Sequence, residues 1–246
     1  MSARLYITQS LTGGAAIALD EKQTHYLIHV LRQKTGDTIQ VFNGHDGVWL
    51  AEITLLHKKN ITVTLHRALR IQQSVPDIWL LAAPLRGGKT EFVVEKATEL
   101  GISRFIPVLT EFTVARRINE ERLTTIAIEA AEQCERMDIP VIDSLTSFTD
   151  MLGNWDKNRM ILHCDESGSG QNAKTLPSAL PATKYAVLIG PEGGFSEKER
   201  DLLRHAGFAA GMCMGPRILR ADTAAIAALT LTQAWLGDWD KKPDFS

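Results

Sequence analysis

The hydrophobic and polar residues of the first 70 positions follow a pattern that is typical of short strands. Apolar residues come in brief runs or alternate with polar ones, and turns such as Gly13-Gly14 and Asn43-Gly44 separate the runs. These segments are residues 5–8, 15–19, 38–42, 48–55 and 61–65. One helix interrupts them between Glu21 and Arg32, where Leu27 and Leu31 recur at helical spacing. Strands and a helix over so short a stretch predict a small β-barrel.

After residue 76 the pattern changes to strands that alternate with helices. Segments of helix length cover residues 89–100, 120–136 and 222–236, and a further helix begins at the capping-box pair Ser196 and Glu199. Apolar runs of strand length are residues 78–83, 105–108, 159–163, 186–189 and 211–214. This alternation predicts a mostly parallel sheet with helices on both faces. The polar stretch 72–76 separates the two patterns, so we expect one domain over residues 1–72 and a second over residues 77–246.

Two glycine-proline loops end neighbouring strands of the second domain. Gly190-Pro-Glu-Gly-Gly194 follows the run 186–189, and Gly215-Pro216 follows the run 211–214. Glycine lets a ligand approach the backbone amides, and proline stiffens the turn. Because ligands of open α/β sheets bind at the carboxyl ends of strands, the loops predict a cofactor site, although two ordinary tight turns are the alternative. Neither loop matches GxGxxG or a Walker phosphate loop, which argues against NAD and ATP.

The composition indicates a cytoplasmic protein without a membrane segment. The 246 residues are 44% hydrophobic, which is enough for a core, and no apolar run approaches the ~20 residues of a membrane helix. The N-terminus lacks the features of a secretion signal, and the three cysteines have no CxxC spacing, which fits reduced thiols. His25 and His29 have the spacing of helical metal ligands, but without an acidic partner we expect no metal site.

The charge distribution bears on nucleic-acid binding. A net charge of −2 argues against a protein that coats nucleic acid indiscriminately. The first 70 residues carry eight Lys and Arg against five Asp and Glu, so this part can present a basic face to phosphates. On charge alone, an ordinary solvated surface is the better explanation of so small an excess.

Several separated motifs resemble those of a known enzyme family. The first is Leu188-Ile-Gly-Pro-Glu-Gly-Gly194, and the second is Met214-Gly-Pro-Arg-Ile-Leu-Arg-Ala-Asp-Thr-Ala224. The others are His29-Val-Leu-Arg32, Val94-Glu-Lys-Ala-Thr-Glu-Leu-Gly101 and Glu129-Ala-Ala-Glu-Gln133. In order and spacing they resemble the 16S ribosomal RNA uracil-N3 methyltransferases, a family of the SPOUT class of S-adenosyl methionine enzymes. The resemblance spans nearly the whole chain.

The resemblance implies a fold, a reaction and partners. The fold is a PUA-like RNA-binding β-barrel followed by a SPOUT α/β domain whose C-terminal segment threads a deep trefoil knot. The reaction transfers a methyl group from S-adenosyl methionine to N3 of a uracil in 16S rRNA, and the protein is a homodimer. We expect the assembled small ribosomal subunit as the substrate, with naked RNA as the alternative. Two other functions stay open: a SPOUT methyltransferase with a different target, such as a ribose 2′-hydroxyl, and a non-catalytic RNA-binding protein.

The resemblance also implies which residues hold the cofactor. They lie in the two glycine-proline loops and are Leu188, Gly190, Pro191, Glu192, Gly193, Gly194, Met214, Gly215, Pro216, Arg217, Ile218 and Leu219. The stretch from His163 to Glu166, at the end of the preceding strand, is a candidate third wall of the site. A surface turn is the alternative explanation of that stretch.

Methylation at N3 requires a nitrogen that has lost its proton. On the resemblance, Arg220 at the end of the second loop stabilises the negative charge that develops on the uracil carbonyls; the alternative for Arg220 is an ion pair with Asp222 at the helix entry. Glu192 or Asp222 accepts the proton. We prefer Glu192, because the helix dipole lowers the basicity of Asp222, although Glu192 can instead offset the charge of the sulfonium.

Two positions depart from the family pattern. Asp222 stands where the family usually has Glu, and Phe112 stands where it usually has an arginine, which Arg116 or Arg117 can replace. The RNA is expected to lie across both domains and to offer an unpaired base. The candidate phosphate contacts, each of which can instead be a solvated charge, are Arg32, Arg86, Lys89, Lys96, Arg116, Arg136 and Arg217.

Overall fold

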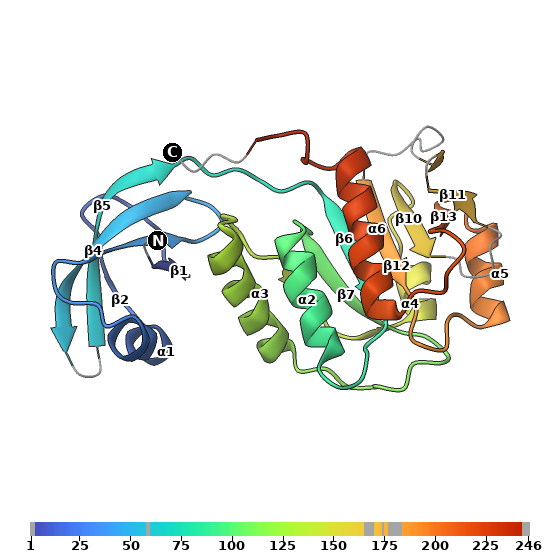
Figure 1. Ribbon diagram of the computed structural model, residues 1–246, viewed down its shortest axis with the longest axis horizontal. Coiled ribbons are helices and arrows are strands. Elements are labelled where there is room, and N and C mark those ends of the chain that lie inside the picture. Colours follow the sequence, from blue (N-terminus) through green and yellow to red (C-terminus); the bar gives the residue numbers. More distant parts are fainter. Residues whose placement is uncertain (1–2, 58–59, 165–169, 174, 177–183, 243–246) are drawn as a thin grey trace. The chain divides into compact units, whose positions relative to one another are not determined.

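The chain divides into two compact units. The computed structural model describes residues 3–57, 60–164, 170–173, 175–176 and 184–242 (Figure 1). The first unit comprises Met1–Ser74 together with Ala131–Ile139, and the second comprises Val75–Ala130 together with Pro140–Ser246. The chain therefore returns briefly to the first unit in the middle of the second, which the sequence pattern did not predict.

The first unit is built on a curled sheet. Its strands are β1 (Arg4–Tyr6), β2 (Ala16–Ala18), β3 (Thr38–Phe42), β4 (Val48–His57) and β5 (Asn60–Arg70), in the order β1-β3-β4-β5-β2. β1 is parallel to β3, and the other neighbours are antiparallel. Alternate residues such as Ile39, Val41 and Ile53 are fully buried in one core, as the alternating sequence predicts. The described pairings leave β1 and β2 as the two edges, so the sheet is an open, half-closed barrel.

The helix of the first unit ends earlier than the sequence predicts. α1 (Glu21–His25) begins with a capping box between Asp20 and Gln23, and it widens into the π-helix η1 (Tyr26–Val30). Arg32 then adopts the left-handed conformation with φ 56°, and the N–H of Gln33 donates to the carbonyl of Leu27 at 2.9 Å. This closing bond ends the helix without a glycine.

A buried arginine joins residues 131–139 to the first unit. The guanidinium of Arg4 donates to the carbonyl oxygens of Ala131 at 3.2 Å and Arg136 at 3.1 Å, and it lies 4.5 Å from the centre of the Phe42 ring. Burial, followed by the charge of nearby Arg70, lowers the pKa of Arg4 to about 10. The end of α3 (Glu120–Cys134) is thus capped by a side chain more than a hundred residues away in the sequence.

The second unit holds a parallel sheet, as the sequence predicts. Its order is β11-β13-β10-β12-β6-β7-β8, and β9 pairs with β7 beside this path. Every recorded pairing is parallel. The strands are β6 (Ile78–Ala82), β7 (Arg104–Leu109), β8 (Val141–Ile142), β9 (Thr146–Ser147), β10 (Arg159–Cys164), β11 (Gln171–Asn172), β12 (Lys184–Ile189) and β13 (Ala209–Cys213).

Helices cover both faces of this sheet. One core contains Leu80 and Val187 and residues of α2 (Lys89–Glu99), α3 and α6 (Ala221–Leu236). The next residues along the strands, Leu81 and Leu188, point into a second core with α4 (Phe148–Gly153) and α5 (Glu197–His205). Successive strand residues face opposite sides, so continuous apolar runs feed both cores.

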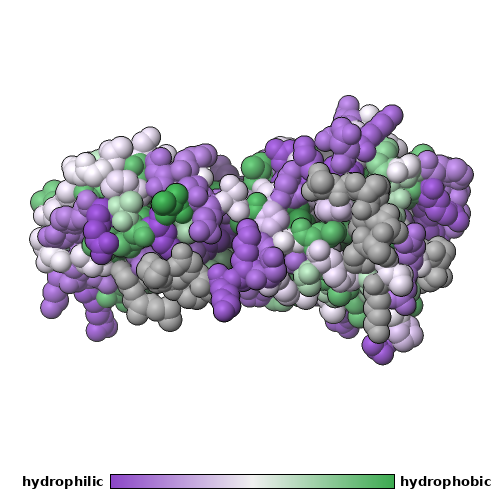
Figure 2. Space-filling model, turned by 90° about the horizontal axis from the view of Figure 1, so that it is seen from above, coloured by the Kyte–Doolittle hydropathy of each residue, from purple (hydrophilic) through white to green (hydrophobic). Residues whose placement is uncertain are grey.

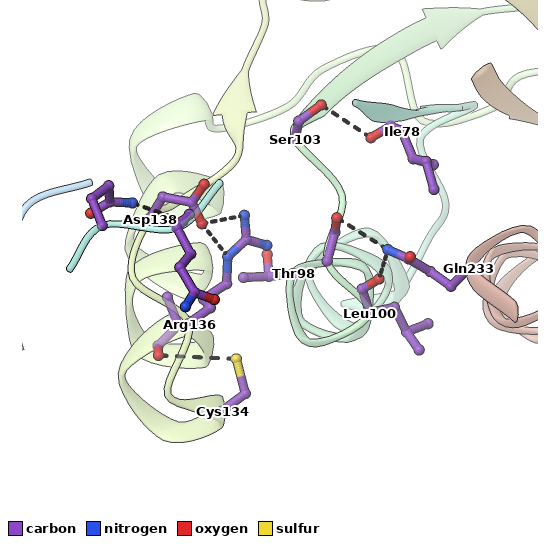
Figure 3. Close-up of polar contacts among 12 residues, drawn as sticks. Ile78, Thr98, Leu100, Ser103, Cys134, Arg136, Asp138 and Gln233 are labelled. Carbon is purple, nitrogen blue, oxygen red and sulfur yellow. Dashed lines mark hydrogen bonds and ion pairs between the residues drawn. The ribbon is translucent and has the colours of Figure 1, made fainter. Parts of the chain in front are cut away.

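One buried glutamine holds α2 beside α6 (Figures 1 and 3). The side-chain amide of Gln233 in α6 donates to the carbonyl oxygens of Leu100 at 2.6 Å and Gly101 at 3.2 Å, at the end of α2. These carbonyls lack intrahelical partners, so Gln233 satisfies them from outside the helix. The C-terminal ends of α2 and α6 are thereby held together, and α6 begins at the candidate site.

The surface is mixed in polarity. Figure 2 shows hydrophobic residues in small groups surrounded by hydrophilic ones. No helix within the described part of the chain is both long enough and apolar enough to cross a lipid bilayer.

Candidate functional site

A cavity of about 590 Å³ lies between the two glycine-proline loops. β12 and β13 flank β10 in parallel, so the loops that follow them emerge at the same edge of the sheet. The volume falls within the roughly 300–1,000 Å³ that is usual for small-molecule sites. The lining residues are Cys164, Ile189, Gly190, Pro191, Glu192, Gly194, Phe195, Met212, Cys213, Met214, Gly215, Pro216, Arg217, Ile218, Leu219, Arg220, Ala221 and Ala224.

The first loop is held by a turn and by the helix behind it. Gly194 has φ +67°, a left-handed angle that favours glycine, and its N–H donates to the carbonyl of Pro191 at 2.9 Å. A Cβ added at Gly190 would lie 3.1 Å from the Phe195 ring, so no larger residue fits there without displacing that ring. The predicted capping box of Ser196 and Glu199 is present at the start of α5.

The carboxylate of Glu199 also reaches a second segment. One oxygen accepts from the N–H of Ser196 at 2.8 Å, and the other accepts from the N–H of Glu111 at 2.8 Å. Glu199 is buried, so these charge-assisted bonds are shielded from water. They fix the first loop to the segment that follows β7.

The second loop leads directly into α6. Gly215 has φ +102°, which again favours glycine. Arg220 is the N-cap residue of α6 with extended backbone angles, and its carbonyl accepts from the N–H of Ala224 at 2.7 Å. Its exposed side chain lines the cavity. A guanidinium therefore stands at the mouth of the cavity, next to the N-terminus of a helix.

Most of the predicted cofactor residues line this cavity, together with the predicted catalytic residue Arg220. Three predicted residues do not. Leu188 is buried in the core, Gly193 packs against Phe112, and the carboxylate of Asp222 forms an ion pair with Lys89 at 3.2 Å. The roles assigned to these residues from the sequence stay predictions.

The ion pair with Lys89 makes the Asp222 carboxylate a weaker base. Burial acts to raise the pKa of Asp222, but the hydrogen bond from Lys89 and the one from the Thr223 N–H outweigh it, and the pKa lies below its ordinary value. Asp222 pairs with Lys89, so the alternative of an Arg220–Asp222 pair is not the arrangement observed. Glu192, by contrast, is exposed and lines the cavity.

The candidate third wall is present in part. Cys164 lines the cavity, and its burial raises the pKa of the thiol to about 12, so it stays protonated at neutral pH. His163 is buried, and a Cβ added at Gly211 would lie 3.2 Å from its ring. Asp165 and Glu166 lie outside the described residues.

The predicted RNA contacts differ in exposure. Arg32, Arg86 and Arg116 are exposed. Lys89 pairs with Asp222, and Lys96 pairs with Glu95 and Glu99. Only 7% of the Arg136 side chain is exposed, and its guanidinium pairs with Asp138 at 2.8 Å (Figure 3). As placed here, Arg136 offers little surface to a phosphate.

The sequence did not single out several lining residues. Phe195, Cys213 and Ala224 belong to the cavity wall. Lys89 was predicted as a phosphate contact, but its ion pair with Asp222 was not predicted. Phe195 directly follows the first loop, so its position in the sequence could have identified it as a lining residue. Glu199 was recognised as a cap, but its bond to Glu111 joins residues that are 88 positions apart.

Comparison with known proteins identifies the family. A family model described as an RNA methyltransferase domain matches residues 72–233, and one described as an RNA methyltransferase PUA domain matches residues 19–65. A ribosomal RNA small subunit methyltransferase E of Rickettsia conorii is 35% identical over 228 residues, which is 92% of this chain and 93% of the relative. The chain belongs to the ribosomal RNA small subunit methyltransferase E family.

Two solved structures of similar proteins contain the cofactor. The family member of Neisseria gonorrhoeae, crystallised with S-adenosyl methionine, has a TM-score of 0.87 and 26% identity over 97% of this chain and all of that one. A methyltransferase of Legionella pneumophila in complex with the same cofactor has a TM-score of 0.87 and 29% identity over 97% of this chain and 99% of that one. The family resemblance read from the sequence is confirmed.

The residues of the cavity fit such a cofactor. Gly215 leaves open space where a Cβ would stand, and Gly190 lets the Phe195 ring pack against the first loop. Ile189, Met214 and Leu219 give apolar walls, and Glu192 would supply a negative charge that favours a cationic sulfonium.

Proposed function

We propose that this protein methylates N3 of a uracil in 16S rRNA, using S-adenosyl methionine. The observation that carries the proposal is the cavity between the two glycine-proline loops, with Arg220 at its edge. Membership of the family and the cofactor in the two similar structures support the reaction class. The position on the base rests on the resemblance of the loop motifs and on the chemistry of the groups around the cavity.

The two loops hold the cofactor in this proposal. The backbone from Gly190 to Gly194 and from Met214 to Leu219 binds its adenine, ribose and methionine parts. When bound, S-adenosyl methionine supplies an electrophilic methyl group on a positively charged sulfur. Met214, Leu219 and Phe195 exclude water from that group.

Arg220 stabilises the reacting form of the base. Uracil N3 carries a proton at neutral pH, and its loss places negative charge on the two flanking carbonyl oxygens. A fixed guanidinium that donates to one of them stabilises this anion. The helical backbone that starts at Arg220 holds its Cα in place, so only the side chain must orient itself.

Glu192 is the proton acceptor in this proposal. It is exposed in the cavity wall, within reach of a base that enters from solvent. Asp222 is the poorer base, because its pairing with Lys89 lowers its pKa. In our account Asp222 and Lys89 fix the starts of α6 and α2 relative to one another.

Further properties follow from the same proposal. The first unit binds rRNA with Arg32 as a phosphate contact, and Arg86 and Arg116 of the second unit are further phosphate contacts. The substrate is the assembled small ribosomal subunit. The matching PUA domain supports RNA binding by residues 1–72. We also propose that residues 77–246 form a SPOUT domain with a C-terminal trefoil knot, and that the protein acts as a cytoplasmic homodimer.

Nucleoside mass spectrometry of 16S rRNA tests the proposed reaction. A strain that lacks the gene should lose 3-methyluridine from its 16S rRNA, and the wild-type gene should restore it. Loss of a 2′-O-methyl nucleoside instead would assign a different target, and an unchanged nucleoside profile would point to a protein that only binds RNA. Either of these results would overturn the proposal.

A further inference from the structure

The segment after β7 exposes apolar side chains beside the first glycine-proline loop. Phe112 is 45% exposed and Val114 is 52% exposed, whereas Thr113 between them is buried. An aromatic ring that stays in contact with water forgoes the free energy that its burial would contribute. A side chain that stays exposed in a well-held segment is therefore a candidate for contact with another molecule.

The segment is held firmly at its base. The hydroxyl of Thr113 accepts from the N–H of Thr110 at 2.9 Å, and the two threonine hydroxyls lie 2.8 Å apart in the interior. The N–H of Glu111 donates to buried Glu199 at 2.8 Å. Phe112 lies between these anchors, so its backbone is fixed while its side chain points outward.

Phe112 also lies against the site. A Cβ added at Gly193 would be 3.0 Å from the Cβ of Phe112 and 3.6 Å from its Cγ. The glycine therefore lets the aromatic residue approach the loop backbone closely. Gly193 directly follows Glu192, the proton acceptor in the proposed reaction, so the ring stands at the edge of the space that a base must enter.

The same segment carries free positive charge. Arg116 and Arg117 are exposed, and neither has an ion-pair partner among the described residues. An exposed aromatic ring with guanidinium groups a few residues away matches single-stranded RNA, whose bases stack on aromatic rings and whose phosphates pair with arginine.

We propose that Phe112 is a stacking surface for an unpaired base of the RNA substrate, with Arg116 and Arg117 binding the adjoining phosphates. This inference rests on the proposed function and adds to it the residue that positions the RNA beside Glu192. Phe112 is not among the residues that line the cofactor cavity, so we expect its replacement to affect RNA binding and not cofactor binding.

Steady-state methylation of small ribosomal subunits from the deletion strain tests the role of Phe112. Base stacking on an aromatic side chain corresponds to about 5-fold to 150-fold in affinity, so Phe112→Ala should raise the KM for subunits by about fivefold or more. Phe112→Tyr keeps the ring and should stay within about twofold of the wild type. Phe92→Ala is the matched control, because Phe92 is 41% exposed on α2, and it should leave KM unchanged.

Two further readouts separate stacking from a structural role. The melting temperature and the dissociation constant for S-adenosyl methionine, measured by calorimetry, should be the same for Phe112→Ala and the wild type. A wild-type KM in Phe112→Ala, with an active wild-type enzyme, would overturn the inference. If the wild-type enzyme forms no 3-methyluridine, the proposed function fails. Filter binding of a labelled single-stranded RNA then tests Phe112 independently. Weaker binding by Phe112→Ala supports stacking, and binding equal to that of the wild type rejects it.

Discussion

Replacement of Gln233 by leucine should loosen the packing of α6 against α2. Gln233 is 1% exposed, and its amide nitrogen donates to the carbonyl oxygens of Leu100 and Gly101 (Figure 3). Its carbonyl oxygen accepts from the N–H of Asp238 at 3.4 Å, near the upper limit for a hydrogen bond. Leucine has a similar size but neither donor nor acceptor, so Gln233→Leu removes these bonds without opening a large cavity.

The expected loss of stability follows from the groups that are left without partners. A buried acceptor that loses its donor costs about 1–3 kcal/mol. Leu100 and Gly101 are only partly buried, so water replaces part of the lost bonding. We therefore expect a loss of about 2–4 kcal/mol in the free energy of unfolding, which corresponds to a melting temperature lower by roughly 5–12 °C.

Thermal unfolding followed by circular dichroism measures this effect. Gln133→Leu is the matched control, because Gln133 is an exposed residue of α3 and the same substitution there should change stability by no more than about 0.5 kcal/mol. Equal melting temperatures for Gln233→Leu and Gln133→Leu would refute the argument that Gln233 holds α2 and α6 together.

Three further predictions concern the site and the pH dependence of stability. Arg220→Ala should lower kcat for methyl transfer by about a hundredfold or more while S-adenosyl methionine still binds, and full activity would contradict its role. Gly190→Val should weaken binding of S-adenosyl methionine by calorimetry by about tenfold, equivalent to ~1.4 kcal/mol, because its side chain meets the Phe195 ring; an unchanged affinity would count against the site. Burial acts to raise the pKa of Asp77, but the bonds with Arg159 outweigh burial and lower this pKa below 3.8. The ion pair therefore stabilises the fold fully above pH 3.8, and this stabilisation is lost as the pH falls through the lowered pKa. Asp77→Asn should therefore be less stable than the wild type at pH 7, by at most about 1 kcal/mol for so exposed a carboxylate. A urea-unfolding difference that does not shrink as the pH falls from 3.8 through the lowered pKa would disprove this.

The longer strands and helices were predictable from the sequence because local pattern decides them, whereas α4 and the two-residue strands β8, β9 and β11 were not predicted. Alternating runs such as residues 38–42 and the buried run 186–189 became strands β3 and β12. The helix expected to reach Arg32 instead ended at Val30, because Arg32 took a left-handed angle that sequence does not favour in arginine. Local propensity predicts where an element forms more reliably than where it ends.

The contacts around the site were harder to predict, because they join distant parts of the chain. The glycine-proline loops were visible as motifs, and most of their residues do line one cavity. The pairing of Lys89 with Asp222 and the bond from Glu111 to Glu199 depend on how the sheet brings separate elements together. Arg136 looked like a surface charge, but the fold of residues 131–139 buries most of its side chain.

A crystal structure of the protein with S-adenosyl methionine tests the central claim most directly. The account predicts that the cofactor lies between the loops 190–194 and 214–219, with its methyl group facing the space between Glu192 and Arg220. A cofactor bound outside this cavity, or a methyl group turned away from Arg220, would contradict it.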